Sequence, residues 1–115
     1  MSTYLTILGF NSAIPTINTS PTSQLLEMEE RCFLIDCGEG TQVQLRKAKA
    51  RFSKINHIFI SHLHGDHCFG LPGLIASFRL LGREVPLHVY GPKGIKKMLE
   101  TIFTITETHR GFEVV

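Results

Sequence analysis

The sequence predicts an α/β fold built on a mixed β-sheet. After residue 30, runs of β-branched and aromatic residues alternate with segments of helical periodicity, which is typical of strands joined by helical crossovers. Before that point, two apolar runs flank a short charged turn, which predicts a hairpin and therefore antiparallel pairing at one side of the sheet. A chain of 115 residues can form one ordinary domain, so we expect residues 1–115 to form a single domain.

The first predicted elements are a strand, a loop and the hairpin. Residues 4–8 are β-prone and end at a glycine. Residues 11–23 are rich in Ser, Thr, Asn and Pro, which favours a loop. The hairpin strands are residues 24–28 and 32–35, joined by a turn slightly longer than the tightest type.

The middle of the chain predicts a helix, a buried strand and a second helix. Residues 41–50 contain strong helix formers, and Thr41 is a possible N-cap. Residues 55–61 are β-branched and aromatic, and predict a buried strand. Residues 70–81 predict an amphipathic helix that a glycine ends. Its apolar face comprises Leu71, Leu74, Ile75, Phe78 and Leu81.

The last part of the chain predicts a strand over residues 87–90, a helix, and the start of another strand at 112–115. The helix follows Gly91-Pro92, and its apolar residues recur at helical spacing. These residues are Ile95, Met98, Leu99 and Ile102.

The composition is that of a globular protein. Hydrophobic residues make up 43% of the chain and charged residues 19%, which excludes a disordered tail. The net charge of +2 does not by itself indicate nucleic acid, so RNA binding would need a local basic patch. The chain lacks both a run of roughly 18 apolar residues and a basic segment followed by an apolar one. We therefore expect a cytoplasmic protein without membrane association.

The cysteines agree with that location. Cys32, Cys37 and Cys68 are odd in number and form no CxxC pair. Reduced, mostly buried thiols are therefore favoured over zinc ligation by cysteine, which requires paired spacing.

The most informative feature is the segment HLHGDH, in which four ligand-type residues fall within six positions. His62 and His64 are two residues apart, so on extended backbone both imidazoles point the same way and can reach one metal ion. Asp66 and His67 are adjacent and should turn away from that pair toward a second metal, with Gly65 allowing the bend. The segment follows the predicted strand 55–61, at the carboxyl edge where α/β folds place ligands.

These ligand types favour particular metals and a particular reaction. Imidazole plus carboxylate favours zinc over magnesium or calcium, with manganese, iron or cobalt possible. Two divalent ions about 3.5–4 Å apart can hold both the entering and the leaving oxygen of a phosphoryl displacement. The segment therefore predicts a two-metal hydrolase, and a fortuitous histidine-rich turn is the much weaker alternative.

The flanking sequence resembles the ribonuclease Z family, tRNA 3′-processing endonucleases of the metallo-β-lactamase superfamily. The resemblance rests on residues 33–42 (FLIDCGEGTQ), 56–67 (NHIFISHLHGDH) and 70–74 (GLPGL). HxHxDH alone is shared by many hydrolases of the superfamily. The combination of DCGEGTQ with SHLHGDH is far more specific.

The resemblance implies the αββα sandwich of the superfamily and two zinc ions per complete active site. His62 and His64 would bind the first zinc ion, and Asp66 and His67 the second. Asp66 would also be the catalytic proton acceptor. The implied partners are precursor tRNA, from which the enzyme removes the 3′ trailer, and a second copy of the chain in a homodimer.

Asp36 matches the aspartate of the superfamily's first motif, and two roles stay open for it. It could order the metal loop from outside the ligand set. It could equally serve as a helix cap or turn residue at the end of its strand.

The chain departs from the family pattern in one respect. The family needs a further His for each zinc and an Asp that bridges both, but no Asp follows Asp66. The later histidines are His88, which fits a structural role in a strand, and His109, which lies in a polar stretch. We therefore expect residues 1–115 to be the N-terminal portion of the sandwich. Alone, they should bind zinc weakly and leave precursor tRNA uncleaved, because each metal would have two protein ligands.

Two smaller signals and two rival functions complete the predictions. Arg46, Lys47, Lys49, Arg51 and Lys54 form a basic cluster that is either a solvated face or a contact for tRNA phosphates. His57 is favoured as a structural histidine over a catalytic one.

The rival functions are another phosphodiesterase or arylsulfatase-like hydrolase of the superfamily, and a non-catalytic fragment that acts as an interaction module.

Overall fold

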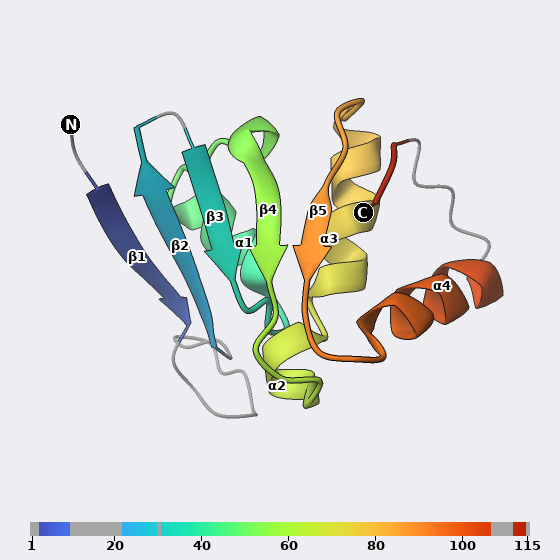
Figure 1. The fold of residues 1–115 in the computed structure, drawn as a ribbon. Helices are drawn as coiled ribbons and strands as arrows, with labels where there is room; N and C mark the ends of the chain where they lie inside the picture. The colour runs from blue at the N-terminus through green and yellow to red at the C-terminus, as the bar shows by residue number, and fades with distance from the viewer. Residues whose placement is uncertain (1–2, 10–21, 30, 107–111, 115) are drawn as a thin grey trace.

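The computed structural model describes residues 3–9, 22–29, 31–106 and 112–114, with only the backbone of Asp66. A five-stranded sheet in the order β1-β2-β3-β4-β5 organises the chain (Figure 1). The strands are β1 (Thr3–Gly9), β2 (Ser23–Met28), β3 (Arg31–Ile35), β4 (Ile55–Phe59) and β5 (His88–Tyr90). The helices are α1 (Thr41–Lys47), the 3₁₀ turn η1 (Phe52–Lys54), α2 (Gly65–Cys68), α3 (Leu71–Leu80) and α4 (Ile95–Ile105).

The strand pairing confirms the predicted mixed sheet. β1 with β2 and β2 with β3 pair antiparallel, and β3 with β4 and β4 with β5 pair parallel. The antiparallel part is the predicted hairpin and its N-terminal neighbour, and the parallel part is joined by helices. Of the loop predicted at 11–23, residues 11–21 lie outside the described part of the chain. The assignment of Ser23 to the loop is wrong, because β2 begins at that residue.

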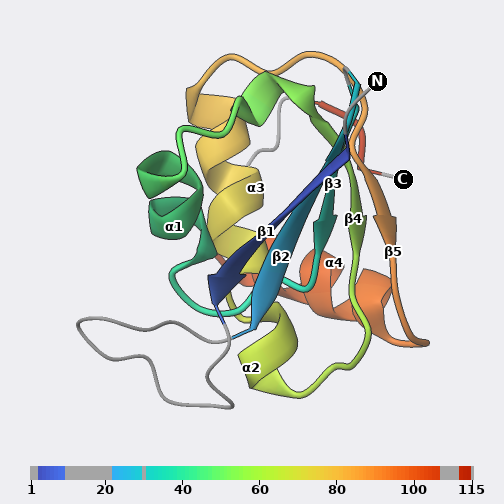
Figure 2. The same cartoon turned by 90° about the vertical axis from the view of Figure 1, so that its left-hand side faces the viewer.

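One face of the sheet carries the helices α1 and α3 (Figure 2). The predicted apolar face of α3 is largely confirmed, because Leu71, Leu74, Ile75 and Phe78 are all buried against the sheet. Leu81 is the exception, since its side chain is 56% exposed beyond the last helical residue. The chain leaves the helix there, and Gly82 then adopts a positive φ of 84°.

Several predicted boundaries are wrong for local reasons. α1 ends at Lys47 rather than at residue 50, and Lys49 adopts a positive φ of 57°. Gly40 is the N-cap, whereas Thr41 is the first helical residue and its Oγ1 donates to the Gly38 carbonyl at 2.7 Å. β4 ends two residues before Ser61. Of the strand predicted at 112–115, Val115 lies outside the described residues, and Val114 forms a parallel bridge with Leu87.

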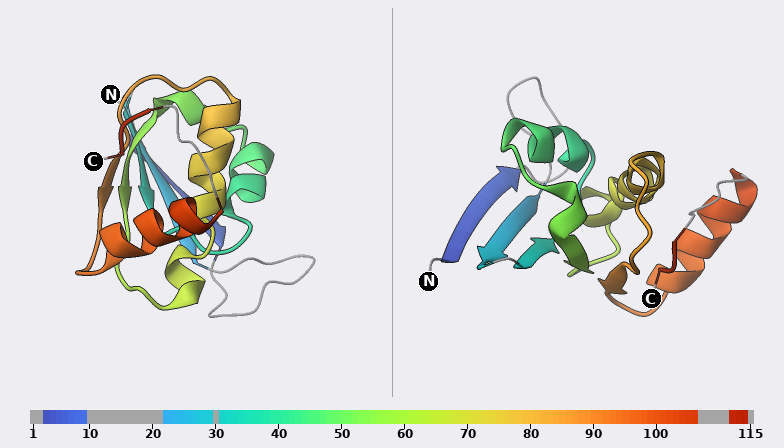
Figure 3. Two further views of the ribbon diagram at one scale, coloured as in Figure 1. Left: turned by 90° about the vertical axis from the view of Figure 1, so that its right-hand side faces the viewer. Right: turned by 90° about the horizontal axis from the view of Figure 1, so that it is seen from above.

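α4 lies beyond β5 at the edge of the sheet, near α3 (Figure 3). Its predicted residue Leu99 is buried, and so is Phe103, which the spacing did not single out. Ile95, Met98 and Ile102 pack against the same core while partly buried. No helix among the described residues is long and apolar enough to cross a membrane.

The second face of the sheet is bare in the part of the chain that the structure describes (Figures 1 and 2). The strand register places Leu5, Leu26, Phe33, His57 and His88 in one row across this face. Its exposed apolar side chains are Leu5, Ile7, Met28, Phe59 and Tyr90. One sheet with helices on a single face is half of an αββα arrangement.

Candidate metal centre

The HLHGDH segment lies at the carboxyl edge of the parallel strands, as predicted. It follows β4 at the lower edge of the sheet in Figure 1. Two backbone hydrogen bonds extend the sheet there: Asp36 N donates to Phe59 O, and Ile60 N donates to Tyr90 O, each at 2.7 Å. The ends of β3 and β5 therefore hold the start of the segment from both sides.

The segment is partly helical, which the sequence did not predict. His64 is extended, with φ −62° and ψ 141°, and the chain then enters the single turn α2 at Gly65. Gly65 does not adopt a positive φ, so the bend requires no left-handed residue. The turn is closed by His67 N, which donates to His64 O at 2.9 Å.

The histidine rings converge differently from the prediction. The ring centroids of His62 and His64 are 6.2 Å apart and nearly parallel, which agrees with side chains on one side of extended backbone. His67 was expected to turn away from this pair, and that is wrong. Its ring centroid lies 4.8 Å from that of His62, because the helical turn brings position 67 back over position 62.

The metal ligands themselves stay predictions. The side chain of Asp66 is outside the described part of the chain. Among the residues that are described, no group of three or more His, Cys, Asp or Glu side chains is arranged to hold a metal ion. The donor types at His62, His64 and His67 nevertheless fit zinc, which takes imidazole nitrogen readily.

Asp36 orders this segment, which is the first of the two roles left open for it. Its side chain is buried, and Oδ1 accepts a hydrogen bond from Ser61 N at 2.7 Å. Its Oδ2 lies 2.9 Å from His67 Nδ1. The helix-cap part of the second role is wrong, because α1 has Gly40 as its N-cap and no side-chain capping bond. The turn part agrees with the backbone of Asp36 at the end of β3. Asp36 also adopts a positive φ of 61°, a conformation that Asp tolerates better than most residues.

Backbone contacts bind the turn after β3 to the same segment. Cys37 N donates to His67 O at 2.8 Å, and Gly70 N donates to Cys37 O at 2.9 Å. A Cβ at position 70 would clash with Gly38 O, so the close approach of these two segments requires glycine there. The histidine segment is therefore clamped onto residues 36–38 by both side-chain and main-chain bonds.

The three cysteines are free and buried, as predicted. Burial raises the pKa of the Cys37 thiol to about 12. The Cys68 thiol donates to Leu63 O and to His64 O, each at 3.6 Å. The Cys68 thiol therefore contacts the backbone of the histidine segment.

Ser61 lies at the centre of the candidate site but was not among the predicted site residues. Its Oγ is within 3.0 Å of both carboxylate oxygens of Asp36 and of His62 Nδ1. A hydroxyl residue directly before the HLHGDH segment was the available signal. Its importance depends on contact with Asp36, which is 25 residues away in the chain.

The remaining predicted residues take structural or exposed positions. His57 and His88 stack on the bare sheet face with ring centroids 5.1 Å apart. Burial, His88 and Arg31 together lower the pKa of His57. His109 lies outside the described residues. The basic cluster lies near the start of β4, at the opposite edge from the histidines, and Arg46 stacks over Phe52 at 5.2 Å.

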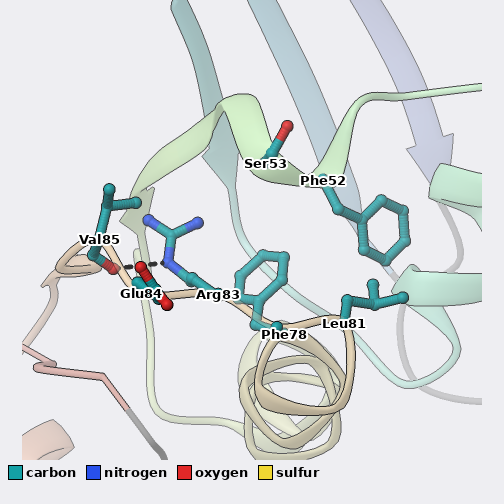
Figure 4. Close-up of a pocket in the computed structure, with 8 residues that line it drawn as sticks. Phe52, Ser53, Phe78, Leu81, Arg83, Glu84 and Val85 are labelled. Atoms are coloured by element: carbon teal, nitrogen blue, oxygen red, sulfur yellow. Dashed lines mark hydrogen bonds between the residues drawn. The ribbon is translucent and has the colours of Figure 1, made fainter.

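That opposite edge also contains a cavity of about 340 Å³ (Figure 4). Phe52, Phe78, Leu81 and Val85 give it apolar walls, and Arg83 lies along one side. The guanidinium donates to protein acceptors rather than into the cavity, since Nη1 binds Ile55 O and Nη2 binds Asn56 Oδ1. The cavity is therefore separate from the candidate metal centre.

Comparison with known proteins agrees with this geometry. Residues 3–106 match the family model described as "Anti-Pycsar protein Apyc1". The chain belongs to that family. The sequence is also similar to curated relatives named ribonuclease Z. One of them, from Bacteroides fragilis, is 58% identical over 95 residues. That match covers 83% of this chain and 31% of the relative, so the chain spans about a third of the length of such relatives.

Solved structures agree with the family assignment. Human tRNase Z, short form, superposes with a TM-score of 0.90 at 40% identity, covering 96% of this chain and 42% of that one. The metallo-β-lactamase fold protein YhfI from Bacillus subtilis superposes with a TM-score of 0.75 over 98% of this chain and 46% of its own, at 20% identity. The predicted resemblance to ribonuclease Z and the metallo-β-lactamase fold are both confirmed.

Proposed function

We propose that this chain supplies the first metal-binding segment of a zinc-dependent endoribonuclease that hydrolyses a phosphodiester to remove the 3′ trailer of precursor tRNA. The observation that carries the proposal is the clamp between Asp36, Ser61 and His67, which presents histidine side chains at the carboxyl edge of the sheet. The relatives named ribonuclease Z and tRNase Z support the substrate.

Each residue of the segment has a proposed role. His62 and His64 would hold one zinc ion, and Asp66 and His67 a second. When bound, the two ions would supply a hydroxide nucleophile and stabilise charge on the entering and leaving oxygens. Asp66 would accept the proton of the attacking water. Asp36 would keep His67 in place through its hydrogen bond to Nδ1.

The architecture of the complete enzyme is also a proposal. Residues 1–115 would form one incomplete metallo-β-lactamase domain, whose bare apolar sheet face would receive the second sheet of the αββα sandwich. The additional zinc ligands would come from outside this chain. A homodimer and precursor tRNA as partner follow from the family resemblance. A cytoplasmic location is the expectation from the sequence composition and the cysteines.

A second hydrolase function is favoured by one observation. The family model that covers residues 3–106 carries a description different from ribonuclease Z. Another phosphodiesterase or an arylsulfatase-like hydrolase of the superfamily is therefore the alternative. It would use the same histidine segment on a small ester instead of tRNA.

The test is a chimera in which this chain replaces the matching segment of the Bacteroides fragilis ribonuclease Z. We expect zinc-dependent release of the 3′ trailer from precursor tRNA. The same chimera with His64→Ala should lose activity by about a hundredfold or more, because it removes a metal ligand. A chimera that binds zinc and hydrolyses a small phosphodiester but leaves precursor tRNA intact would favour the alternative.

The chain by itself provides a second test. Residues 1–115 should bind zinc weakly and should not cleave precursor tRNA, because two protein ligands per metal are too few. Tight stoichiometric zinc together with nuclease activity in this chain alone would contradict the proposal that the site is completed from elsewhere.

A further inference from the structure

Ser61 connects the buried carboxylate of Asp36 to the first histidine of the segment. Its backbone N–H donates to Asp36 Oδ1 at 2.7 Å. Its Oγ lies 2.9 Å from Oδ1 and 2.8 Å from Oδ2 of the same carboxylate. The same Oγ lies 3.0 Å from His62 Nδ1. It also lies 3.3 Å from His67 Nδ1, so one hydroxyl contacts the carboxylate and both imidazoles, with His62 the nearer of the two.

The direction of these bonds follows from what each group can donate. An ionised carboxylate only accepts, whereas a serine hydroxyl has one proton to donate and lone pairs with which to accept. Hydrogen bonds to a charged acceptor are roughly twice as strong as bonds between neutral groups. The Ser61 proton therefore goes to Asp36, and its Oγ is left to accept a proton from His62 Nδ1.

Both histidines that contact this group then carry their proton on the same ring nitrogen. His67 Nδ1 lies 2.9 Å from Asp36 Oδ2, so its Nδ1–H donates to the carboxylate directly. His62 Nδ1–H donates to the same carboxylate through the serine hydroxyl. In a neutral imidazole with the proton on Nδ1, the lone pair is on Nε2. In the His62 ring, the Nε2 lone pair can then bind a cation.

His64 provides a comparison within the same segment. In the part of the chain that is described, its ring makes no hydrogen bond and its only ring contact is with His62. Nothing there selects one of its two tautomers. Control of the tautomer is therefore restricted to the two histidines that reach Asp36, one directly and one through Ser61.

We propose that Ser61 is a positioning residue that extends the hydrogen-bonding influence of Asp36 to His62, fixing its Nδ1–H tautomer and presenting Nε2 to a divalent metal ion. This proposal rests on the proposed metal-binding function. The tautomers themselves are a property of the metal-free chain, so they can be measured whether or not the protein cleaves precursor tRNA.

The test uses histidine tautomers observed by ¹⁵N NMR in the metal-free protein at about pH 8, where an ordinary imidazole is neutral. In the unmodified chain, His62 and His67 should both be Nδ1–H, and His64 should be a mixture. Ser61→Ala should turn His62 into a mixture while His67 stays Nδ1–H. The backbone bond from residue 61 to Asp36 persists in that variant, so loss of folding is not expected. Ser61→Thr retains the hydroxyl and should restore the His62 tautomer.

Metal affinity gives an independent readout. Zinc binding should weaken by about ten- to a hundredfold in Ser61→Ala and recover in Ser61→Thr, as expected for a group that orients a ligand. An Nε2–H tautomer at His62 in the unmodified chain would overturn the proposal without any variant. An unchanged Nδ1–H tautomer at His62 in folded Ser61→Ala would overturn it as well.

Discussion

One charged side chain forms several hydrogen bonds at each end of β4. The two ends differ in which groups these bonds hold in place. At the carboxyl end, Asp36 accepts hydrogen bonds from Ser61 and His67. At the amino end, Arg83 donates from Nη1 to Ile55 O, from Nη2 to Asn56 Oδ1 and to Pro86 O, and from Nε to Val85 O. Figure 4 shows the hydrogen bond from this arginine to Val85 as a dashed line.

The difference lies in what remains free at each end. The acceptors that Arg83 contacts belong to the protein backbone or to a side chain of the same edge, and its guanidinium also stacks 5.1 Å over Phe78. The guanidinium of Arg83 therefore donates its hydrogen bonds to groups within the fold. Asp36 contacts His67 Nδ1 directly and Ser61, whose Oγ in turn contacts His62 Nδ1. One end of β4 is therefore held by bonds within the fold alone, whereas the other end positions histidines that we propose as metal ligands.

Removing the Asp36 carboxylate should have the largest effect. Asp36→Ala loses charge-assisted bonds to Ser61 and His67 and places Ala at a positive φ of 61°. We expect the free energy of unfolding to fall by about 3 kcal/mol or more. Urea denaturation measures this change. Asp36→Asn is the matched control, because Asn tolerates the same backbone and should lose less. A loss below about 1 kcal/mol in Asp36→Ala would contradict the clamp.

Removing the guanidinium of Arg83 should destabilise the chain without affecting the metal site. Arg83→Met keeps much of the aliphatic stem over Phe78 but loses the bonds to the start of β4. The expected loss is about 2–3 kcal/mol, again by urea denaturation. Arg83→Lys should recover little, because a lysine ammonium lacks the fork of donors. Weaker zinc binding by folded Arg83→Met would show that the two ends are coupled.

A pair of glycine substitutions compares the two ends directly. Gly70→Ala places a Cβ against Gly38 O, so the backbone that carries Asp36 must shift, and we expect a loss of about 2 kcal/mol. Gly82→Ala meets no atom within 4 Å and suffers only from its positive φ of 84°, a cost of about 1 kcal/mol. Thermal unfolding of both variants would test this order. The reverse order would contradict the tight contact at position 70.

The smallest expected effect concerns His57 on the bare sheet face. Burial, His88 and Arg31 lower its pKa, so the unfolded chain takes up a proton there before the folded chain does. Its contribution to stability is therefore present above the unfolded pKa and is lost as pH falls through the folded value. His57→Phe, which keeps an aromatic ring, should reduce the loss of stability on acidification. An NMR titration in which the pKa of His57 lies above the ordinary value would refute this.

The sequence predicted much of the fold because local patterns specify it. The helical spacing of Leu71, Leu74, Ile75 and Phe78 identified the face of α3 that is buried. The hairpin and the parallel strands followed from apolar runs and their connections. Boundaries such as the end of α1 could not be predicted, since the left-handed conformation of Lys49 has no signal in the residue type.

The candidate metal site stays a prediction from residue type, and the arrangement of its side chains differs from the one expected. The ligand pattern and its position after β4 were evident in the HLHGDH segment itself. The return of His67 toward His62 depends on the helical turn α2, and the role of Ser61 depends on Asp36. The contacts with Asp36 join segments 25 to 31 residues apart, and no periodicity along the chain encodes them.

The central claim is that the Asp36 clamp prepares the histidine segment to bind metal. Zinc affinity, measured by competition with a chromophoric chelator, tests it most directly in the unmodified chain, Asp36→Asn and Arg83→Met. We predict that Asp36→Asn weakens zinc binding by about ten- to a hundredfold, as expected when the partner of a metal-ligating histidine is lost. Arg83→Met should leave the affinity of the folded protein unchanged. Equal affinity in the unmodified chain and Asp36→Asn would contradict the claim.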